Sequence, residues 1–162
     1  MTKRNLRAEF SAVLRKYGHS IIFVHQDKRF RCKCYSERSG EGRSDCGTCF
    51  GTTYRVSVEK RLTRRKVNTV PETLPGVKKV MPAGHSDSLA YVYYLEYDVE
   101  PKEGDLILEV EWQDNVPARI KEKLVVSVAE PMRLVEGRVE FYQVYVRTEA
   151  KGANDHAALT QH

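Results

Sequence analysis

The sequence predicts a mainly β fold, a small antiparallel β-barrel or sandwich with an N-terminal helix and an inserted four-cysteine module. Three observations predict this class. Apolar and polar residues alternate in several short runs of the last third of the chain, as they do in half-buried strands. Turn residues separate these runs at short intervals. All four cysteines lie as two close pairs between residues 32 and 49, which is typical of a small module held together at one point.

The first part of the chain predicts a helix followed by two strands. Apolar residues at three- and four-residue steps predict an amphipathic helix over about residues 3–17. Gly18 follows it, where a helix end favours a residue that tolerates left-handed backbone geometry. Residues 21–24, continuing to residue 35, predict one strand, and residues 52–58 predict another. The two strands would pair as a hairpin and give a zinc-ribbon-like module.

The last third predicts at least four strands. Residues 91–99 and 106–112 alternate strongly and flank a turn at residues 101–105, which predicts that these two strands form a hairpin. Residues 124–128 and 139–147 predict two further strands. We interpret the tyrosines of these runs as core and strand-face residues, and not as a platform for stacking nucleic-acid bases.

Composition divides the chain into four parts. Residues 1–66 hold the helix and the cysteine module and are basic. Residues 67–89 contain several prolines, which exclude a continuous helix or a central strand and predict an extended connecting arm. Residues 90–149 form the predicted antiparallel β domain, and residues 150–162 form a small, polar C-terminal tail. We expect the arm and the tail to reach neighbouring chains.

The cysteine pattern predicts a tetrahedral metal site. Zn²⁺ binds thiolates at about 2.3 Å, so four sulfurs must converge on one point. Cys46 and Cys49 have the usual C-x-x-C spacing, and Gly51 follows where a tight turn can require positive φ. Cys32 and Cys34 are only two residues apart, but side chains at i and i+2 of an extended strand share one face. We predict structural Zn²⁺, because a closed four-cysteine site has no open position for chemistry.

Other interpretations of the cysteines stay open. Two disulfides would suit a secreted domain, but the first residues lead into a charged segment and not into an apolar signal sequence. A redox C-x-x-C favours a strand-to-helix context, whereas the residues after Cys49 predict a strand. Free thiols and an iron–sulfur cluster are also compatible with four cysteines.

The net charge of +5 conceals two oppositely charged halves. Residues 1–66 contain 17 Lys and Arg against 6 Asp and Glu, whereas residues 67–162 contain 10 against 16. This asymmetry fits nucleic acid beside the basic half, head-to-tail contact between copies of the chain, or two ordinary solvated surfaces. The densest basic run is a candidate contact with DNA or a partner, and comprises Lys60, Arg61, Arg64, Arg65 and Lys66.

The sequence contains no catalytic pattern. The five histidines are scattered, and none has metal-binding spacing. No glycine-rich loop suited to phosphate is present. No apolar run approaches the ~20 residues needed to cross a bilayer. We therefore predict neither an enzyme nor a membrane protein, and the reduced cysteines indicate synthesis in a cytoplasm.

The order of motifs resembles that of small virion proteins of large contractile-tailed bacteriophages. The shared features are the step Tyr17-Gly18-His19 after an opening helix, a basic C-x-C strand, a C-x-x-C-x-G knuckle, the segment Glu59-Lys60-Arg61, a turn and acidic strand over residues 103–112, and a final strand that starts at Gly137. The knuckle is also similar to the repeats of DnaJ-type chaperone zinc domains. It occurs only once here, however, and Thr53 replaces the second glycine, which argues against a co-chaperone.

The resemblance implies a head-closure or neck protein, a class whose members form small barrels stacked as rings beneath the portal. It implies a structural virion protein, made in the host cytoplasm, that forms a homo-oligomeric ring. Its partners would be virion proteins on the portal or adaptor side and on the tail side, with non-specific contact with passing DNA as an open question. The alternative is a nucleic-acid-binding zinc-ribbon protein.

Overall fold

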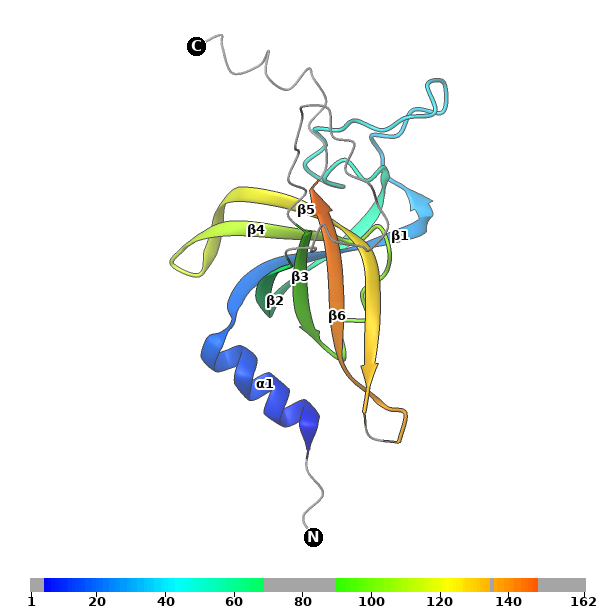
Figure 1. Cartoon of the computed structure of the whole chain (residues 1–162). Helices are drawn as coiled ribbons and strands as arrows, with labels where there is room; N and C mark the ends of the chain where they lie inside the picture. Colours follow the sequence, from blue (N-terminus) through cyan, green and yellow to red (C-terminus); the bar gives the residue numbers. More distant parts are fainter. Residues whose placement is uncertain (1–4, 69–89, 135, 149–162) are drawn as a thin grey trace, which may run out of the picture.

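The computed structural model describes residues 5–68, 90–134 and 136–148. Its one helix and six antiparallel strands confirm the predicted mainly β class (Figure 1). In chain order the elements are α1 (Leu6–Tyr17), β1 (His19–Arg31), β2 (Tyr54–Asn68), β3 (Ala90–Glu96), β4 (Leu106–Gln113), β5 (Val116–Arg133) and β6 (Val139–Thr148). The predicted tail and residues 69–89 of the predicted arm lie outside the described residues, whereas residues 67 and 68 belong to β2.

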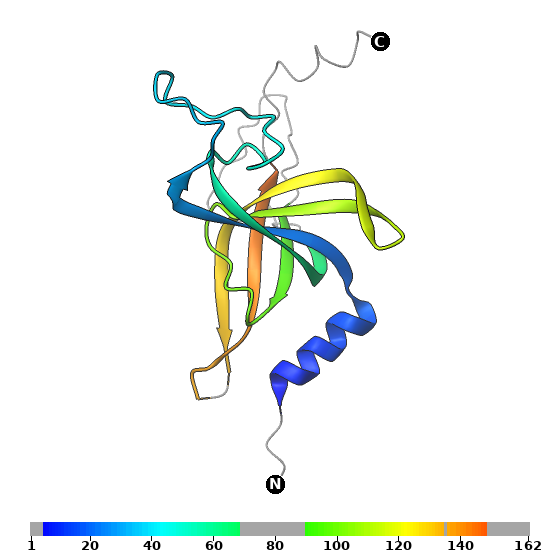
Figure 2. The ribbon, with the colours of Figure 1, turned by 180° about the vertical axis from the view of Figure 1, so that it is seen from behind.

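The six strands form one sheet that closes on itself, which we call the strand ring. The order around it is β1-β2-β3-β6-β5-β4, and β4 returns to pair with β1 from Ile22↔Leu108 to Val24↔Leu106. Strands from the basic first part therefore share one sheet with strands from the acidic second part. Seen from both sides, α1 lies at one end of the ring and the long β1–β2 loop at the other (Figures 1 and 2). No helix of the described residues is long and apolar enough to span a membrane.

Two apolar clusters occupy the two faces of β1 and β4. The larger one fills the ring interior and includes Phe23, Tyr93 and Ile107, all fully buried. Side chains alternate across a strand, so the neighbouring residues Val24 and Leu106 point outward. They form the second cluster, which Phe50 of the β1–β2 loop helps to cover. Through Phe50, the β1–β2 loop packs against the outer face of the ring, and β4 is buried on both faces.

The predicted hairpin between residues 91–99 and 106–112 is wrong. β3 pairs with β2 and β6, whereas β4 pairs with β1 and β5, so these strands lie on opposite sides of the ring. The residues between them form a connection longer than a hairpin turn. Asp105 fixes this connection, because its buried carboxylate accepts the backbone N–H groups of Lys102 (2.8 Å) and Gln26 (2.9 Å). β4 is thereby directed to β1.

The observed hairpin of β4 is with β5. Its turn consists of Asp114 and Asn115, whose φ angles of 48° and 66° are both left-handed. Two such residues make the hairpin turn that matches the twist of the flanking strands. β5 is much longer than the predicted strand at residues 124–128, because its first residues pair with β4 beyond the ring core.

Gly18 has a different role from the one predicted. Its backbone is extended, with φ −86°, and its amide donates to the carbonyl oxygen of Leu14 at 2.8 Å. A Cβ at this position would lie 2.4 Å from the oxygen of Leu14 and 2.7 Å from that of Thr63. Glycine is required here because a Cβ would overlap the last turn of α1 and the backbone of β2, and not because of left-handed geometry.

Candidate metal centre

The β1–β2 loop brings all four cysteines to one point. The sulfurs of Cys32, Cys34, Cys46 and Cys49 lie within 4.8 Å of one another, and none forms a disulfide. The Sγ atoms are 4.0 Å apart in Cys32 and Cys46, and 3.6 Å apart in Cys34 and Cys49. Four thiolates at about 2.3 Å from one ion are about 3.8 Å apart in a tetrahedron. These two separations are close to that value, and all four sulfurs lie near enough together to hold one metal ion.

The second cysteine pair sits in a tight knuckle. The N–H of Phe50 donates to the carbonyl of Cys46 at 2.8 Å, and the N–H of Thr52 donates to that of Cys49 at 3.1 Å. Gly51 has φ +79°, as predicted, and a Cβ there would lie 2.7 Å from the Ser44 carbonyl oxygen. Glycine is therefore required at position 51, because the backbone has a positive φ and because a Cβ would clash with the Ser44 carbonyl.

The knuckle also favours a thiolate. Backbone N–H groups of Cys49 and Thr48 donate to the sulfur of Cys46 and lower the pKa of its thiol to about 6. Desolvation acts in the opposite direction on Cys34 and raises its pKa to about 12. A bound cation favours the thiolate at every position, because its charge is the largest in such a site.

The first cysteine pair does not lie in an extended strand, which corrects the predicted geometry. β1 ends at Arg31, and the N–H of Tyr35 donates to the carbonyl of Cys32 at 3.0 Å. A turn, and not the alternation of a strand, therefore directs the two sulfurs to one side. The N–H of Cys32 donates to the Thr53 carbonyl at 2.9 Å, which joins the two ends of the loop beside the cluster.

The predicted basic run lies on β2, where part of it is already paired. Arg61 forms ion pairs with Glu59 at 2.9 Å and Asp98 at 2.8 Å. Arg65 forms one with Glu122 at 3.0 Å. The ammonium of Lys60 lies 4.3 Å from the ring centroid of Trp112 and donates to Asn115. Arg64 and Lys66 are exposed.

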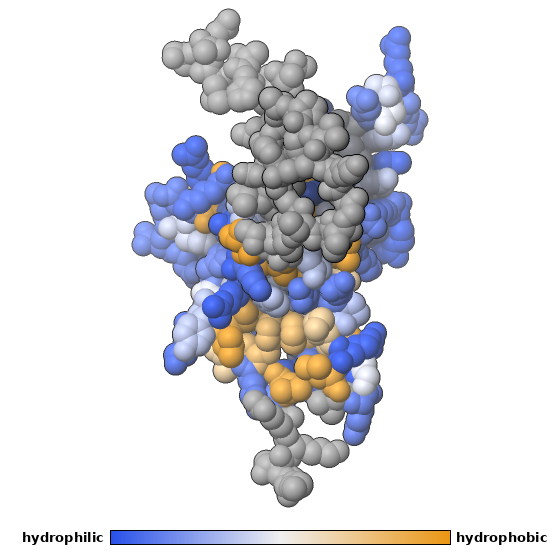
Figure 3. All heavy atoms as spheres, in the orientation of Figure 1, coloured by the Kyte–Doolittle hydropathy of each residue, from blue (hydrophilic) through white to orange (hydrophobic). Residues whose placement is uncertain are grey.

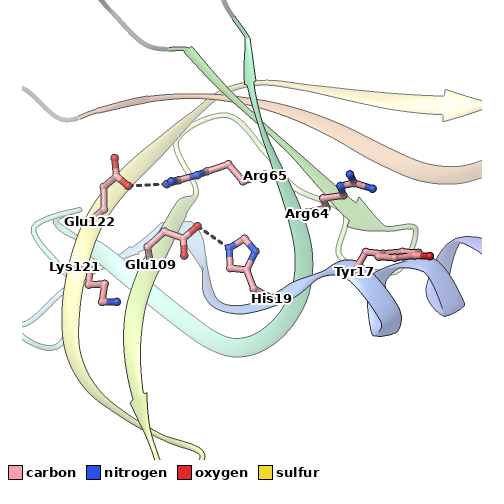
Figure 4. A pocket seen from close by; sticks show the side chains of 7 residues that line it. All are labelled: Tyr17, His19, Arg64, Arg65, Glu109, Lys121 and Glu122. Carbon is pink, nitrogen blue, oxygen red and sulfur yellow. Dashed lines mark hydrogen bonds and ion pairs between the residues drawn. The ribbon is translucent and has the colours of Figure 1, made fainter.

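Arg64 and Arg65 line an open cleft of about 530 Å³ (Figure 4). Glu109 accepts hydrogen bonds there from His19 (2.9 Å) and from the hydroxyl of Tyr93 (2.8 Å). Burial favours the neutral acid, but these bonds hold the pKa of Glu109 below its ordinary value. Burial and the adjacent carboxylate raise the pKa of Tyr93. The cleft contains no serine or cysteine nucleophile among its lining residues, and its charges are largely paired with each other.

Sequence reasoning missed a cluster around His25. The ring Nε2 atom lies 2.9 Å from a Glu59 oxygen, and Nδ1 lies 3.5 Å from an Asp105 oxygen. The hydrogen bond with Asp105 is the main cause of a raised His25 pKa, partly offset by burial and supported by Glu59. No local signal could identify this group, because its members come from β1, β2 and the β3–β4 connection.

Comparison with known proteins does not assign the chain to a family. No protein-family model matches the chain, and no curated protein matches it.

Proposed function

We propose that this chain is a structural protein of a tailed bacteriophage, a subunit of the ring that joins head to tail, with Zn²⁺ in its four-cysteine site. The motif order of the sequence supports this assignment. The physical observation that supports it is the β4–β5 hairpin, whose outer strand edge pairs with no strand of the described residues.

The β4–β5 hairpin extends beyond the strand ring as a two-stranded ribbon (Figure 1). β4 pairs with β1 only as far as Leu108, and β5 pairs with β6 only from Leu124. The outer edge of residues 116–122 therefore pairs with no strand of the described chain. Val116 and Ile120 on this edge strand are 62% and 47% exposed. A two-stranded ribbon is marginally stable in water, and an open strand edge is a template for pairing with another chain.

A second apolar area lies on a different part of the surface. Figure 3 shows apolar atoms gathered over α1 and the adjoining ends of β3 and β6. On α1 itself, Val13 is 43% exposed and Tyr17 is 60% exposed. A subunit of a cyclic ring needs two different contact areas, one for each neighbour. The ribbon and α1 would provide two such areas.

We propose Zn²⁺ as the metal of this site. Four thiolates in a tetrahedron suit Zn²⁺ or iron, and the sulfur separations fit a single ion. All four positions would be filled by cysteine, so the ion would hold the loop in shape and not activate water. Elemental analysis of the purified chain tests this assignment. We expect one zinc per chain, and iron, with or without inorganic sulfide, would contradict the assignment.

The virion assignment is tested in particles. Quantitative mass spectrometry of the purified phage should find this chain at about six or twelve copies, the multiplicity of a ring at the portal vertex. Ile120→Lys should abolish incorporation and self-association, because it places a charge on the open edge. Val58→Lys is the matched control, since Val58 is similarly exposed on β2. Absence of the chain from particles would refute the proposal.

A further inference from the structure

We propose that the end of the β1–β2 hairpin, beside the four-cysteine site, binds single-stranded nucleic acid. This inference goes beyond the structural role above and does not depend on it. The surface, called here the hairpin surface, combines aromatic rings with exposed basic groups: Phe30, Arg31, Lys33, Tyr35, Tyr54 and Arg55. It is distinct from the basic run at residues 60–66.

A bulge in β1 presents Phe30 to solvent. Asp27 pairs with Arg55, and Arg31 pairs with Tyr54, so residues 28–30 have no counterpart on β2. Bulges of this kind re-aim side chains at the end of a hairpin. Phe30 is 52% exposed as a result. Arg29 lies at one side of the ring, 5.6 Å from its centroid, and is held by Asp27 at 2.9 Å.

Arg31 forms a stacked group with two tyrosines. Its guanidinium carbon lies 4.6 Å from the ring centroid of Tyr35 and 4.4 Å from that of Tyr54. Stacking fixes the planar cation without neutralising it. Within the described chain, neither Arg31 nor the exposed Lys33 forms an ion pair with a carboxylate. Both charges are therefore available to a ligand.

These groups surround a hollow of about 780 Å³. Phe30, Arg31, Lys33, Tyr54 and Arg55 line it together with three of the four cysteines, and no acidic side chain is among the lining residues. The cysteine cluster and the backbone hydrogen bond from Cys32 to Thr53 fix the ends of β1 and β2 here. A bound metal would therefore hold the aromatic and basic groups in place before a ligand arrives, which lowers the cost of binding.

The combination favours a single strand of nucleic acid. Unstacked bases stack on aromatic rings and on arginine planes, while basic groups bind the phosphates. A duplex hides its base faces, so it would leave Phe30 without a partner. An acidic peptide would use the charges but not the ring. On β2, by contrast, Arg61 and Arg65 are already paired within the chain.

The test is fluorescence anisotropy with the metal-loaded full chain and labelled oligonucleotides of about 20 nucleotides, longer than one small binding module covers. Single-stranded DNA, single-stranded RNA and a duplex are compared between about 50 and 200 mM salt. We expect binding of single strands that weakens with salt, and the two single-stranded probes identify the preferred sugar. Phe30→Ala should weaken it by about tenfold, whereas Phe30→Tyr should preserve it. Arg31→Ala should also reduce the salt slope by about one.

The control is the double variant Arg64→Ala and Lys66→Ala, which removes two exposed charges from β2 and should change single-strand affinity little. Metal content and thermal midpoint are measured for every variant, so that loss of the fold is distinguished from loss of the surface. The proposal is overturned if single strands do not bind at low salt, or if the duplex binds more tightly. It is equally overturned if Phe30→Ala binds like the wild type, or if the β2 variant loses binding instead.

Discussion

Removal of the metal from the four-cysteine site should unfold residues 32–53 and leave the strand ring folded. The segment contains 22 residues between the end of β1 and the start of β2. Ordering a backbone costs about 1 kcal/mol per residue or more, hence about 20 kcal/mol for the segment. Seven backbone hydrogen bonds join residues within it, and each contributes about 1 kcal/mol net.

The shortfall of about 13 kcal/mol matches the free energy of a structural zinc site. Such sites contribute about 10–16 kcal/mol near neutral pH. Burial adds little, since Cys32, Cys49 and the partly buried Phe50 are the main apolar contributors. We therefore expect the segment to be stable only when a metal ion is bound.

The ring does not need this contribution. β1 and β2 pair continuously from His19↔Thr63 to Asp27↔Arg55, and β2 also pairs with β3. The interior cluster contains no residue from segment 32–53. The strand ring should therefore stay folded when a chelator removes the metal.

Hydrogen–deuterium exchange with and without a zinc chelator measures the protection of residues 32–53 and of the strand ring separately. Peptides from residues 32–53 should lose protection, those from β3 and β6 should keep it, and added Zn²⁺ should restore the original pattern. Cys49→Ser should reproduce the effect of the chelator, whereas Ser39→Ala in the exposed part of the same loop should not. Unchanged protection in residues 32–53 would refute the structural metal, and loss of protection throughout would refute the independence of the ring.

Three further predictions concern the ring. Gly18→Ala should destabilise the chain by about 1–3 kcal/mol in urea unfolding, because the new methyl group overlaps two carbonyl oxygens; an unchanged midpoint would contradict the close approach. Because folding raises the pKa of His25, its stabilising contribution is complete below about pH 6.5 and is lost as pH rises through the folded-state value. The wild type should have a larger free energy of unfolding than His25→Gln at pH about 6, and this difference should disappear in alkaline buffer. The same difference in unfolding free energy at both pH values would argue against the ion pair with Asp105. Tyr93→Phe should cost about 1–2 kcal/mol, since Glu109 loses a buried donor, and calorimetry showing no change would disprove that bond's contribution.

Local patterns in the sequence were sufficient to predict the helix, the presence of strands and the four-cysteine cluster. The spacing of Leu14 and its apolar neighbours indicates a helix face, and the alternation after residue 90 indicates strands. The alternation does not indicate that β4 is buried on both faces. The four cysteines are close in sequence and are the only ones in the chain, so their convergence needed no long-range information. These features depend on residues a few positions apart.

Which strands pair with each other was decided only by closure of the ring. Alternation shows that β3 and β4 each bury a face, but it is the same whether they pair together or stand on opposite sides. The His25 cluster, the contact at Gly18 and the hairpin surface all join residues from different strands or loops. Each follows from the register of β1 against β2 and β4, and that register is set by burying both faces of β4 at once.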